Sequence, residues 1–388
     1  MQQIKTYIFI TFILFELFAC IEPYELPVSK QASRKYIVSG QLTDQEGFQY
    51  VTVSLASQID NPQYIPLNDC IIIILDDKDN SYPLEEYEEG KYRVWIGAEN
   101  LKQGTSYQLN ILTPAGVNII SDFDKMPSCP DVDSIYYKKE DILTSDPDQP
   151  LQGIQFYINV DASDTENNNF KWEIVETWEY RTEYPISRYY DGEFHYISPP
   201  DYSRSVCWST SKVPYIFTLS VENFNQNTYN GLPLHFVDNQ TARLAYGYSM
   251  LIKQFALNEG AYVYWDQMRL NSSSEASLYE KQPISIKGNL YSLTNPDVEI
   301  LGFFSVTAMK SKRIFVKDVP DLELDYNDFC PEPVGLDRMG WRGYSEDQYP
   351  VYFILVNEAP KILTWTCVDC LQLGGTTVKP IYWPEENN

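Results

Sequence analysis

The chain has 388 residues and carries 54 acidic against 29 basic side chains, for a formal charge of −25. This excess of negative charge repels phosphate backbones and no basic stretch offsets it, so nucleic acid is excluded as a partner. Hydrophobic residues make up 44% of the sequence, which is too apolar for a disordered protein. Length and composition together predict two folded domains with real cores.

Residues 1–19 have the organisation of a bacterial export signal. Lys5 supplies a short cationic region, Tyr7–Phe18 forms an apolar segment, and Leu17-Phe18-Ala19 leads into Cys20. About a dozen apolar residues are too few for a membrane-crossing helix, which needs roughly 20. The pattern resembles a bacterial lipoprotein signal and predicts a lipid anchor on Cys20. The alternatives are an ordinary secretory signal cut nearby and an uncleaved anchor helix.

The next segments predict a tether and a first β domain. Residues 20–34 contain two prolines and no hydrophobic periodicity, which is typical of an extended tether. In residues 35–127, short runs of alternating apolar residues are separated by turn residues, and we expect each to form a strand. The clearest runs are Tyr36–Gly40, Tyr50–Ser57, Cys70–Leu75, Lys91–Ile96, Tyr107–Leu112 and Val117–Ser121. Their spacing predicts an N-terminal immunoglobulin-like or prealbumin-like β-sandwich.

A polar stretch at residues 76–80 is expected to form a hairpin tip inside this sandwich. It lacks the glycine and terminal glutamate of a helical calcium loop, and adventitious calcium binding is the alternative.

Residues 128–388 are expected to form a larger β-rich domain with one short helix. Met126-Pro127-Ser128-Cys129-Pro130 marks the boundary, because two prolines within four residues stop strand pairing. Alternating runs follow at Ile154–Val160, Phe170–Val175, Phe217–Val221, Ser249–Phe255 and Ile300–Val306. Asn258 is a candidate N-cap, and Ala261, Trp265 and Met268 lie at helical spacing. This predicts an amphipathic helix that ends near Asn271 and packs on a sheet.

The cysteines predict disulfides in an exported chain. With Cys20 lipidated, six remain, an even number. Three interpretations compete for the Cys367-Val368-Asp369-Cys370 pair. Redox catalysis would need a helix N-terminus in an α/β fold. A structural zinc site could recruit Cys207 and Cys330 as its third and fourth ligands, but the second C-x-x-C pair that makes such a signal strong is missing. Disulfides from the tail to Cys207 and Cys330 fit best, although the pairing stays open. Cys70 and Cys129 form a third bridge or remain buried thiols.

No catalytic, cofactor or metal residue is expected from the rest of the sequence. The two histidines, His195 and His235, lie in unrelated surroundings. No nucleophile elbow, zinc-protease, P-loop or dinucleotide motif is present, and the acidic pairs are typical of solvated turns. These observations argue against an enzyme.

The C-terminal half resembles a known family in several short motifs in the same order. The motifs are Tyr248–Phe255, Glu259-Gly260-Ala261-Tyr262 with Tyr264-Trp265, Gln282-Pro283, Lys287-Gly288-Asn289, Leu301-Gly302-Phe303-Phe304, the Cys367–Cys370 tail, Gly374-Gly375, Lys379-Pro380 and Trp383. Looser matches in the N-terminal half are Val38-Ser39-Gly40, Gly90-Lys91-Tyr92, Gly104-Thr105-Ser106-Tyr107 and Asp133-Ser134-Ile135. Together these residues resemble the Bacteroidota lipoprotein family called domain of unknown function 4249.

This resemblance implies a lipid-anchored outer-membrane protein, usually encoded beside a TonB-dependent transporter, with no established catalytic residues. Only Cys20 inherits a defined role. The chain departs from the usual pattern in two places: Glu22 and Glu25 are separated where a compact acidic run is common, and Leu371 stands where a basic residue is common.

The resulting hypothesis is a non-catalytic accessory subunit of a TonB-dependent transporter, held at the outer membrane and the cell surface by Cys20, that captures or gates an unknown ligand. The alternatives are a structural or adhesive cell-surface protein that binds a protein or glycan partner, and a hydrolase with an unfamiliar site.

Overall fold

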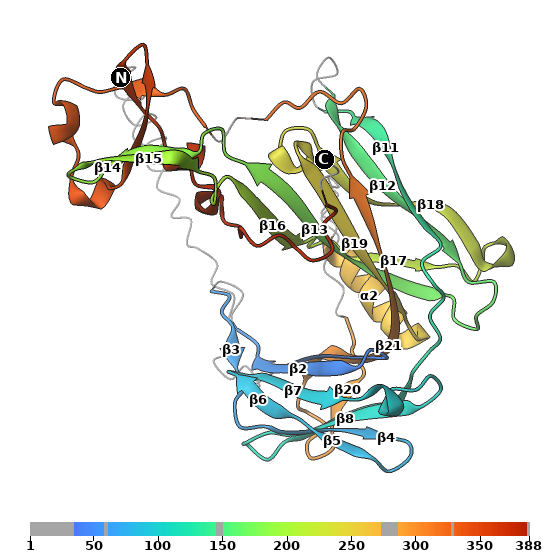
Figure 1. The fold of residues 1–388 in the computed structure, drawn as a ribbon. Helices are drawn as coiled ribbons and strands as arrows, with labels where there is room; N and C mark the ends of the chain where they lie inside the picture. Colours follow the sequence, from blue (N-terminus) through green and yellow to red (C-terminus); the bar gives the residue numbers. More distant parts are fainter. Residues whose placement is uncertain (1–34, 58–60, 145–149, 273–285, 327–329, 386–388) are drawn as a thin grey trace, which may run out of the picture.

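The computed structural model describes residues 35–57, 61–144, 150–272, 286–326 and 330–385, and it shows a mainly β protein (Figure 1). The fold class expected from the sequence is therefore confirmed. The expected signal segment, Cys20 and the tether lie outside the described residues. Among the described residues, no helix is both long enough and apolar enough to cross a membrane.

The first sandwich contains all the strands predicted between residues 35 and 127. One layer holds β1 (Tyr36–Thr43), β2 (Gly47–Leu55), β3 (Ile65–Pro66), β6 (Glu85–Glu88), β7 (Lys91–Ile96) and the first half of β21 (Ile300–Val316). The facing layer holds β4 (Ile71–Asp76), β5 (Ser81–Pro83), β8 (Ser106–Leu112), β9 (Asn118–Ser121), β10 (Asp124–Lys125) and β20 (Leu290–Ser292). The core between the layers is formed by the side chains that alternate inward along each strand. In β2, for example, Val51 and Val53 face inward while Tyr50 faces outward.

The polar tip at residues 76–80 joins β4 to β5 as expected. Asp76 accepts hydrogen bonds from the backbone N–H groups of Lys78 and Asn80, from the Asn80 side chain and from the Tyr82 hydroxyl. Burial alone would raise the pKa of Asp76, but these hydrogen bonds outweigh it and lower the pKa. The carboxylate therefore stabilises its own hairpin.

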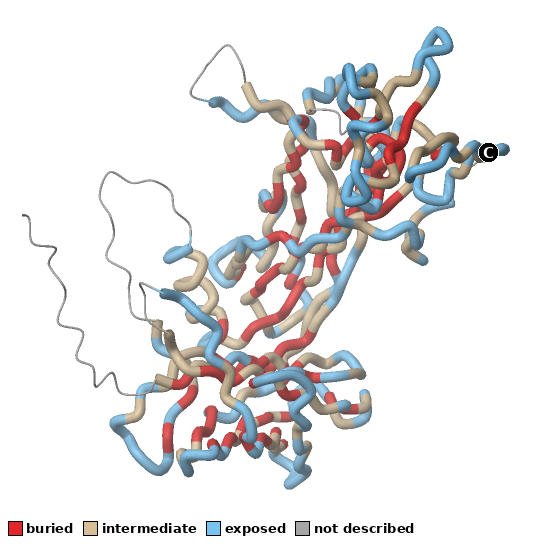
Figure 2. The backbone as a smooth tube through the Cα atoms, turned by 90° about the vertical axis from the view of Figure 1, so that its left-hand side faces the viewer, coloured by how far each residue is buried: buried red, intermediate tan, exposed pale blue. Residues whose placement is uncertain are grey.

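The second sandwich packs a three-stranded sheet against a larger one. The small sheet is β11 (Ser134–Ile142), β12 (Leu151–Asp161) and β18 (Thr228–Asp238), and the larger one holds β13 (Asn169–Arg181), β16 (Val206–Lys212), β17 (Phe217–Ser220), β19 (Gly247–Ala256) and the second half of β21. Ile154, Phe156 and Ile158 of β12 meet Trp172 and Ile252 of the facing sheet in one core. Figure 2 shows buried backbone in both sandwiches.

The predicted helix is α2 (Glu259–Ser272). Ala261 is buried against Phe255, Leu257 and Phe303, and Trp265 packs on the same cluster. The Asn258 carbonyl accepts the first helical hydrogen bond, from Tyr262, while its side-chain amide donates to Asp124 and Lys125 of β10. The helix thus covers a sheet face where the two sandwiches meet.

The long strand β21 joins the two sandwiches, and Figure 1 shows it running from one to the other. Residues 300–307 pair in parallel with β1, and residues 308–316 pair antiparallel with β19. Leu290, Phe304 and Val306 belong to the core of the first sandwich. The expected division into residues 35–127 and 128–388 therefore needs correction, because the chain returns to complete the first sandwich. Local periodicity could not reveal this return, since it depends on a pairing between distant residues.

Two of the motifs behind the family resemblance meet at the start of β21. Asn289 donates a hydrogen bond to the Phe304 carbonyl at 2.7 Å and accepts one from the Phe304 N–H at 3.0 Å. Gly302 has φ +103°, and an ideal Cβ there would lie 1.8 Å from the Val38 carbonyl oxygen. A Cβ on Gly288 would lie 1.7 Å from the Gly302 oxygen. Both glycines are thus required by close backbone packing.

A third, smaller lobe projects from the second sandwich at the upper left of Figure 1. Its sheet has the order β15 (Phe194–Asp201), β14 (Ile186–Tyr190), β23 (Val351–Val356), β24 (Ala359–Ile362) and β22 (Val334–Gly335). Its small core includes Ile186, Tyr352, Leu363 and Val368. A core this limited implies that the lobe depends on covalent bonds as well as apolar burial.

Candidate functional site

Two disulfides fix the C-terminal tail to the small lobe and to β16. Cys370 is bonded to Cys207, and Cys367 is bonded to Cys330. The two cysteines of the C-x-x-C pair belong to different bridges, so the redox and zinc interpretations of this pair are wrong. The tail is tied to the two cysteines that the sequence had suggested, and the structure supplies the pairing.

The remaining described cysteines, Cys70 and Cys129, are free thiols, so they do not form a third bridge. Burial raises the pKa of both, that of Cys129 to about 11. Both thiols are therefore neutral near pH 7 and act as small core side chains.

The two histidines lie in separate places. The His195 ring stacks on Tyr189 at 4.4 Å, and its Nε2 atom lies 2.9 Å from Asp191 Oδ1. His235 is buried in the second sandwich, with Nε2 3.5 Å from Glu176 Oε2. Across the described ranges, histidine, cysteine and acidic side chains form no group of three that could hold a metal ion.

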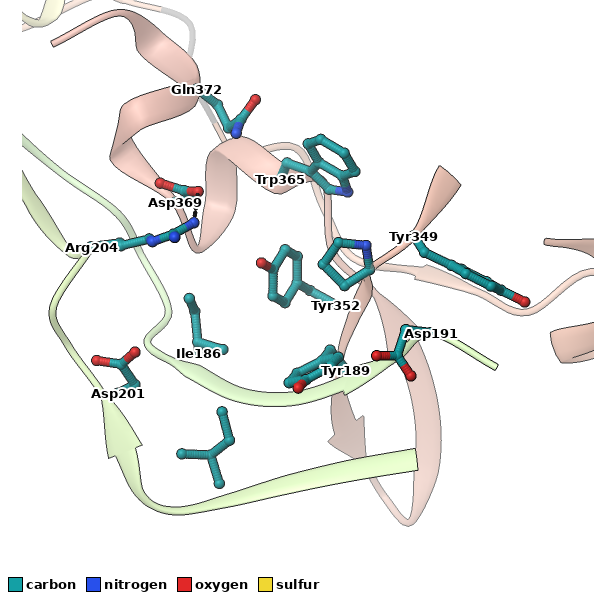
Figure 3. A pocket seen from close by; sticks show the side chains of 12 residues that line it. Ile186, Tyr189, Asp191, Asp201, Arg204, Tyr349, Tyr352, Trp365, Asp369 and Gln372 are labelled. Carbon is teal, nitrogen blue, oxygen red and sulfur yellow. Dashed lines mark hydrogen bonds and ion pairs between the residues drawn. The ribbon is translucent and has the colours of Figure 1, made fainter. Parts of the chain in front are cut away.

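The candidate site is a pocket of about 480 Å³ between the small lobe and the disulfide-bonded tail. Figure 3 shows side chains from β14 and β15, from the loop after β15, from the start of β23 and from the tail around this space. The lining residues are Ile186, Tyr189, Asp191, Ile197, Asp201, Arg204, Tyr349, Pro350, Tyr352, Trp365, Asp369 and Gln372.

One wall of the pocket is an ion pair that the tail holds in place. Arg204 Nη1 donates to Asp369 Oδ2 at 2.7 Å, and this hydrogen bond raises the pKa of Arg204. Asp369 caps the short helix η7 (Cys370–Leu373), since its other oxygen accepts from the Leu371 N–H at 3.0 Å. The Arg204 carbonyl accepts from the Cys370 N–H. Asp369, which lies between the two cysteines, is thus locked by the disulfides and by the cap.

Aromatic rings form the other walls. Tyr189 is stacked against His195, and its ring meets that of Tyr352 edge-to-face at 6.2 Å. Burial, followed by the charge of Asp369, raises the pKa of Tyr352, so its phenol stays neutral. Trp365 is 38% exposed and lies at the rim. The pocket therefore offers both buried and accessible ring surfaces.

Carboxylates give the pocket a negative balance. Hydrogen bonds from Ser203 lower the pKa of Asp201 and keep it ionised. Asp191, Asp201 and Asp369 against Arg204 give a formal charge of −2 in the lining, in a chain that is itself strongly acidic. A negatively charged ligand would meet unfavourable electrostatics here.

An aromatic cluster lies beside the pocket. Trp341 contacts the rings of Tyr190, Phe194 and Phe353 at centroid distances of 5.1, 5.1 and 4.9 Å. Tyr190 follows Tyr189 in β14, and neighbouring residues of a strand face opposite sides. The small sheet thus uses one face for the pocket and the other for aromatic packing.

The sequence did not single out these pocket residues. They come from two separate segments, residues 186–204 and 349–372, and apart from Asp369 none lies in a motif that the sequence analysis identified. The available signals were the abundance of tyrosine and tryptophan and the position of Asp369 within the C-x-x-C pair. Neither signal indicates a site until the disulfide pairing is known, because the pairing determines which segments lie together.

Comparison with known proteins identifies the family. The sequence matches the family model described as Domain of unknown function (DUF4249) over residues 21–313. The chain belongs to this family. The DUF4249 match spans the two sandwiches as far as the second half of β21 and ends before Cys330, Cys367 and Cys370.

No curated protein matches the DUF4249 chain. Among solved structures it is similar to trypsin-activated alpha-2-macroglobulin from Escherichia coli, with 10% sequence identity and a TM-score of 0.19. That similarity covers 84% of this chain but only 18% of the alpha-2-macroglobulin chain, and it carries no argument about fold or function.

Proposed function

We propose that this protein is a lipid-anchored, non-catalytic accessory subunit of a TonB-dependent transporter in the outer membrane of a member of the Bacteroidota. In this proposal Cys20 carries the lipid and the tether sets the reach of the folded body. The pocket of the small lobe captures the substrate or gates its passage.

The observation that carries the proposal is a mixed aromatic and polar pocket in a lobe closed by two disulfides. Disulfides persist in oxidising compartments, which agrees with an exported protein. The first described residues lead into the first sandwich, whereas the pocket lies in the lobe at the other end of the molecule (Figures 1 and 2). An anchor at the first sandwich would leave the pocket free to face a partner.

The pocket chemistry favours binding over catalysis. Asp369 is committed to Arg204 and to the Leu371 N–H. The pKa of Asp201 is lowered, whereas a general acid in glycoside hydrolysis needs a raised one. Asp191 is hydrogen-bonded to the half-buried His195. None of these carboxylates has the setting of a general acid, which favours a binding role for the pocket.

A second candidate, an adhesive surface protein, is favoured by an aromatic patch on the first sandwich. Phe48, Tyr50 and Trp95 are exposed on neighbouring strands. The Arg93 guanidinium lies between the rings of Phe48 and Tyr87, at 4.4 and 4.9 Å from their centroids. Exposed aromatic patches of this kind are common at protein interfaces.

Affinity purification separates the two candidates. A tagged chain is isolated from outer membranes solubilised in mild detergent, and its partners are identified by mass spectrometry. The accessory role predicts recovery of a TonB-dependent transporter with wild type and with Trp95→Ala. Recovery of other surface components alone, and their loss in Trp95→Ala, would contradict the accessory role and support adhesion.

A further inference from the structure

The pocket combines flat ring surfaces with fixed hydrogen-bond donors and acceptors, and this combination restricts its ligand. Trp365 and Tyr189 offer ring surface, and Ile186 and Ile197 add apolar area. Arg204 supplies donors and Asp201 supplies acceptors within the same cavity. A wholly apolar ligand would displace the water that is hydrogen-bonded to these charged groups and would offer no hydrogen bonds in its place. Such desolvation is unfavourable.

Charge argues against ionic ligands. Among the described residues that line the pocket, Arg204 is the single cation, and Asp369 already neutralises it at 2.7 Å. An anion would therefore meet the remaining carboxylates without a free positive partner. An organic cation would be attracted by the carboxylates, but it would leave the donors of the fixed Arg204 guanidinium without a ligand partner, so amines are the competing ligand class in the test below.

We propose that this pocket binds a neutral sugar, with Trp365 stacked on the sugar ring and with Arg204 and Asp201 hydrogen-bonded to its hydroxyl groups. This inference rests on the proposed capture function. A sugar hydroxyl both donates and accepts, so two neighbouring hydroxyls can accept from the guanidinium and donate to the carboxylate. The apolar face of the ring covers the aromatic surface, and Gln372, whose amide both donates and accepts, lines the same pocket.

The arrangement of the walls fits this use. Figure 3 shows Arg204 and Asp369 on one side of the cavity, Tyr352 and Tyr189 toward its middle and Trp365 beside them. The cavity of about 480 Å³ lies within the range typical of small-molecule sites. Trp365 and Asp369 lie on one short segment, which the disulfides of Cys367 and Cys370 fix in place. Asp369 in turn holds Arg204, so the stacking ring and the guanidinium keep a fixed relation.

The test uses the full-length protein in detergent micelles. An array of neutral oligosaccharides, acidic oligosaccharides and organic amines is screened, and the best binder is measured by calorimetry. Trp365→Ala should weaken binding of a neutral sugar about ten-fold or more, because it removes the stacking surface. The matched control Tyr215→Ala removes an exposed aromatic ring that lies outside both the pocket and the aromatic patch of the first sandwich, and it should leave the affinity unchanged. Circular dichroism establishes that both variants are folded.

Three results would overturn the inference: no neutral sugar bound at millimolar concentration, selective retention of acidic sugars or amines, or equal affinities in Trp365→Ala and wild type. Its failure can be told apart from failure of the proposed function. Recovery of the transporter without sugar binding would refute only the ligand class. Sugar binding without a transporter would refute only the accessory role.

Discussion

Replacing Gly302 by alanine is expected to destabilise the junction of the two sandwiches strongly. Gly302 stands in β21 opposite Val38 of β1, in the parallel pairing that completes the first sandwich. Its φ of +103° lies outside the regions that residues with a Cβ adopt readily, and the new Cβ would lie 1.8 Å from the Val38 carbonyl oxygen. Either β1 and β21 separate locally or the backbone of β21 rotates, and both weaken the pairing.

The magnitude follows from two separate costs. An unfavourable backbone conformation costs about 1–3 kcal/mol, and forcing extra atoms into a packed region costs about 1–3 kcal/mol more. We therefore expect a loss of about 4 kcal/mol in the free energy of unfolding. Since domains typically have about 5–15 kcal/mol in total, the melting temperature should fall by roughly 10 °C.

Thermal and urea unfolding, followed by circular dichroism and tryptophan fluorescence, measure this loss. The matched control is Gly116→Ala, because Gly116 also has a positive φ, +79°, but a Cβ added there would meet no atom within 4 Å. The control carries the backbone cost alone, about 1–3 kcal/mol, and should lose less than Gly302→Ala. Equal losses in the two variants would refute the argument that close packing between β1 and β21 requires this glycine.

Three further predictions concern the tail, the Asn289 contact and the hairpin of the first sandwich. Removing the Cys207–Cys370 bridge, which spans 163 residues, should lower the free energy of unfolding by about 5 kcal/mol, and removing Cys330–Cys367, which spans 37, by about 4 kcal/mol. Urea unfolding of the two paired Cys→Ala variants measures this loss, and unfolding like that of wild type would show that the lobe does not need these bridges. Asn289→Ala should lose about 2–3 kcal/mol, because it leaves the N–H and C=O of Phe304 without their partner, and an unchanged unfolding midpoint would contradict this role. Because the pKa of Asp76 is lowered, the stabilisation from its carboxylate is complete above the ordinary carboxyl pKa of 3.8 and is lost as the pH falls through the lowered value. The free energies of unfolding of wild type and Asp76→Asn, measured from pH 6 to pH 2, should therefore converge at the acidic end. A difference that persisted there would count against this role of Asp76.

Sequence periodicity was sufficient to predict the elements with the clearest apolar pattern, whereas the strands of the small lobe were not predicted. The alternation at Ile154–Val160 predicted β12, and the spacing of Ala261 and Trp265 predicted α2, because burial on one face leaves a period of two in a strand and 3.6 in a helix. Element type is a local property, so it could be predicted without knowledge of the pairing partners.

The sequence was insufficient where distant segments meet. The run Ile300–Val306 was assigned to the second domain, whereas it pairs with β1 in the first sandwich. The pocket has the same origin, since Arg204 and Asp369 are 165 positions apart in the sequence and meet beside the Cys207–Cys370 bridge. The C-x-x-C pair indicated disulfides but not the side chains that the disulfides bring together.

The central claim, attachment at the outer membrane through Cys20, is tested most directly by metabolic labelling with an alkyne analogue of palmitate, followed by membrane fractionation. The account predicts that the wild-type protein is labelled and sediments with the outer membrane, and that Cys20→Ala is unlabelled and loses this attachment. An unlabelled wild type, together with a Cys20→Ala variant that fractionates identically, would contradict the account.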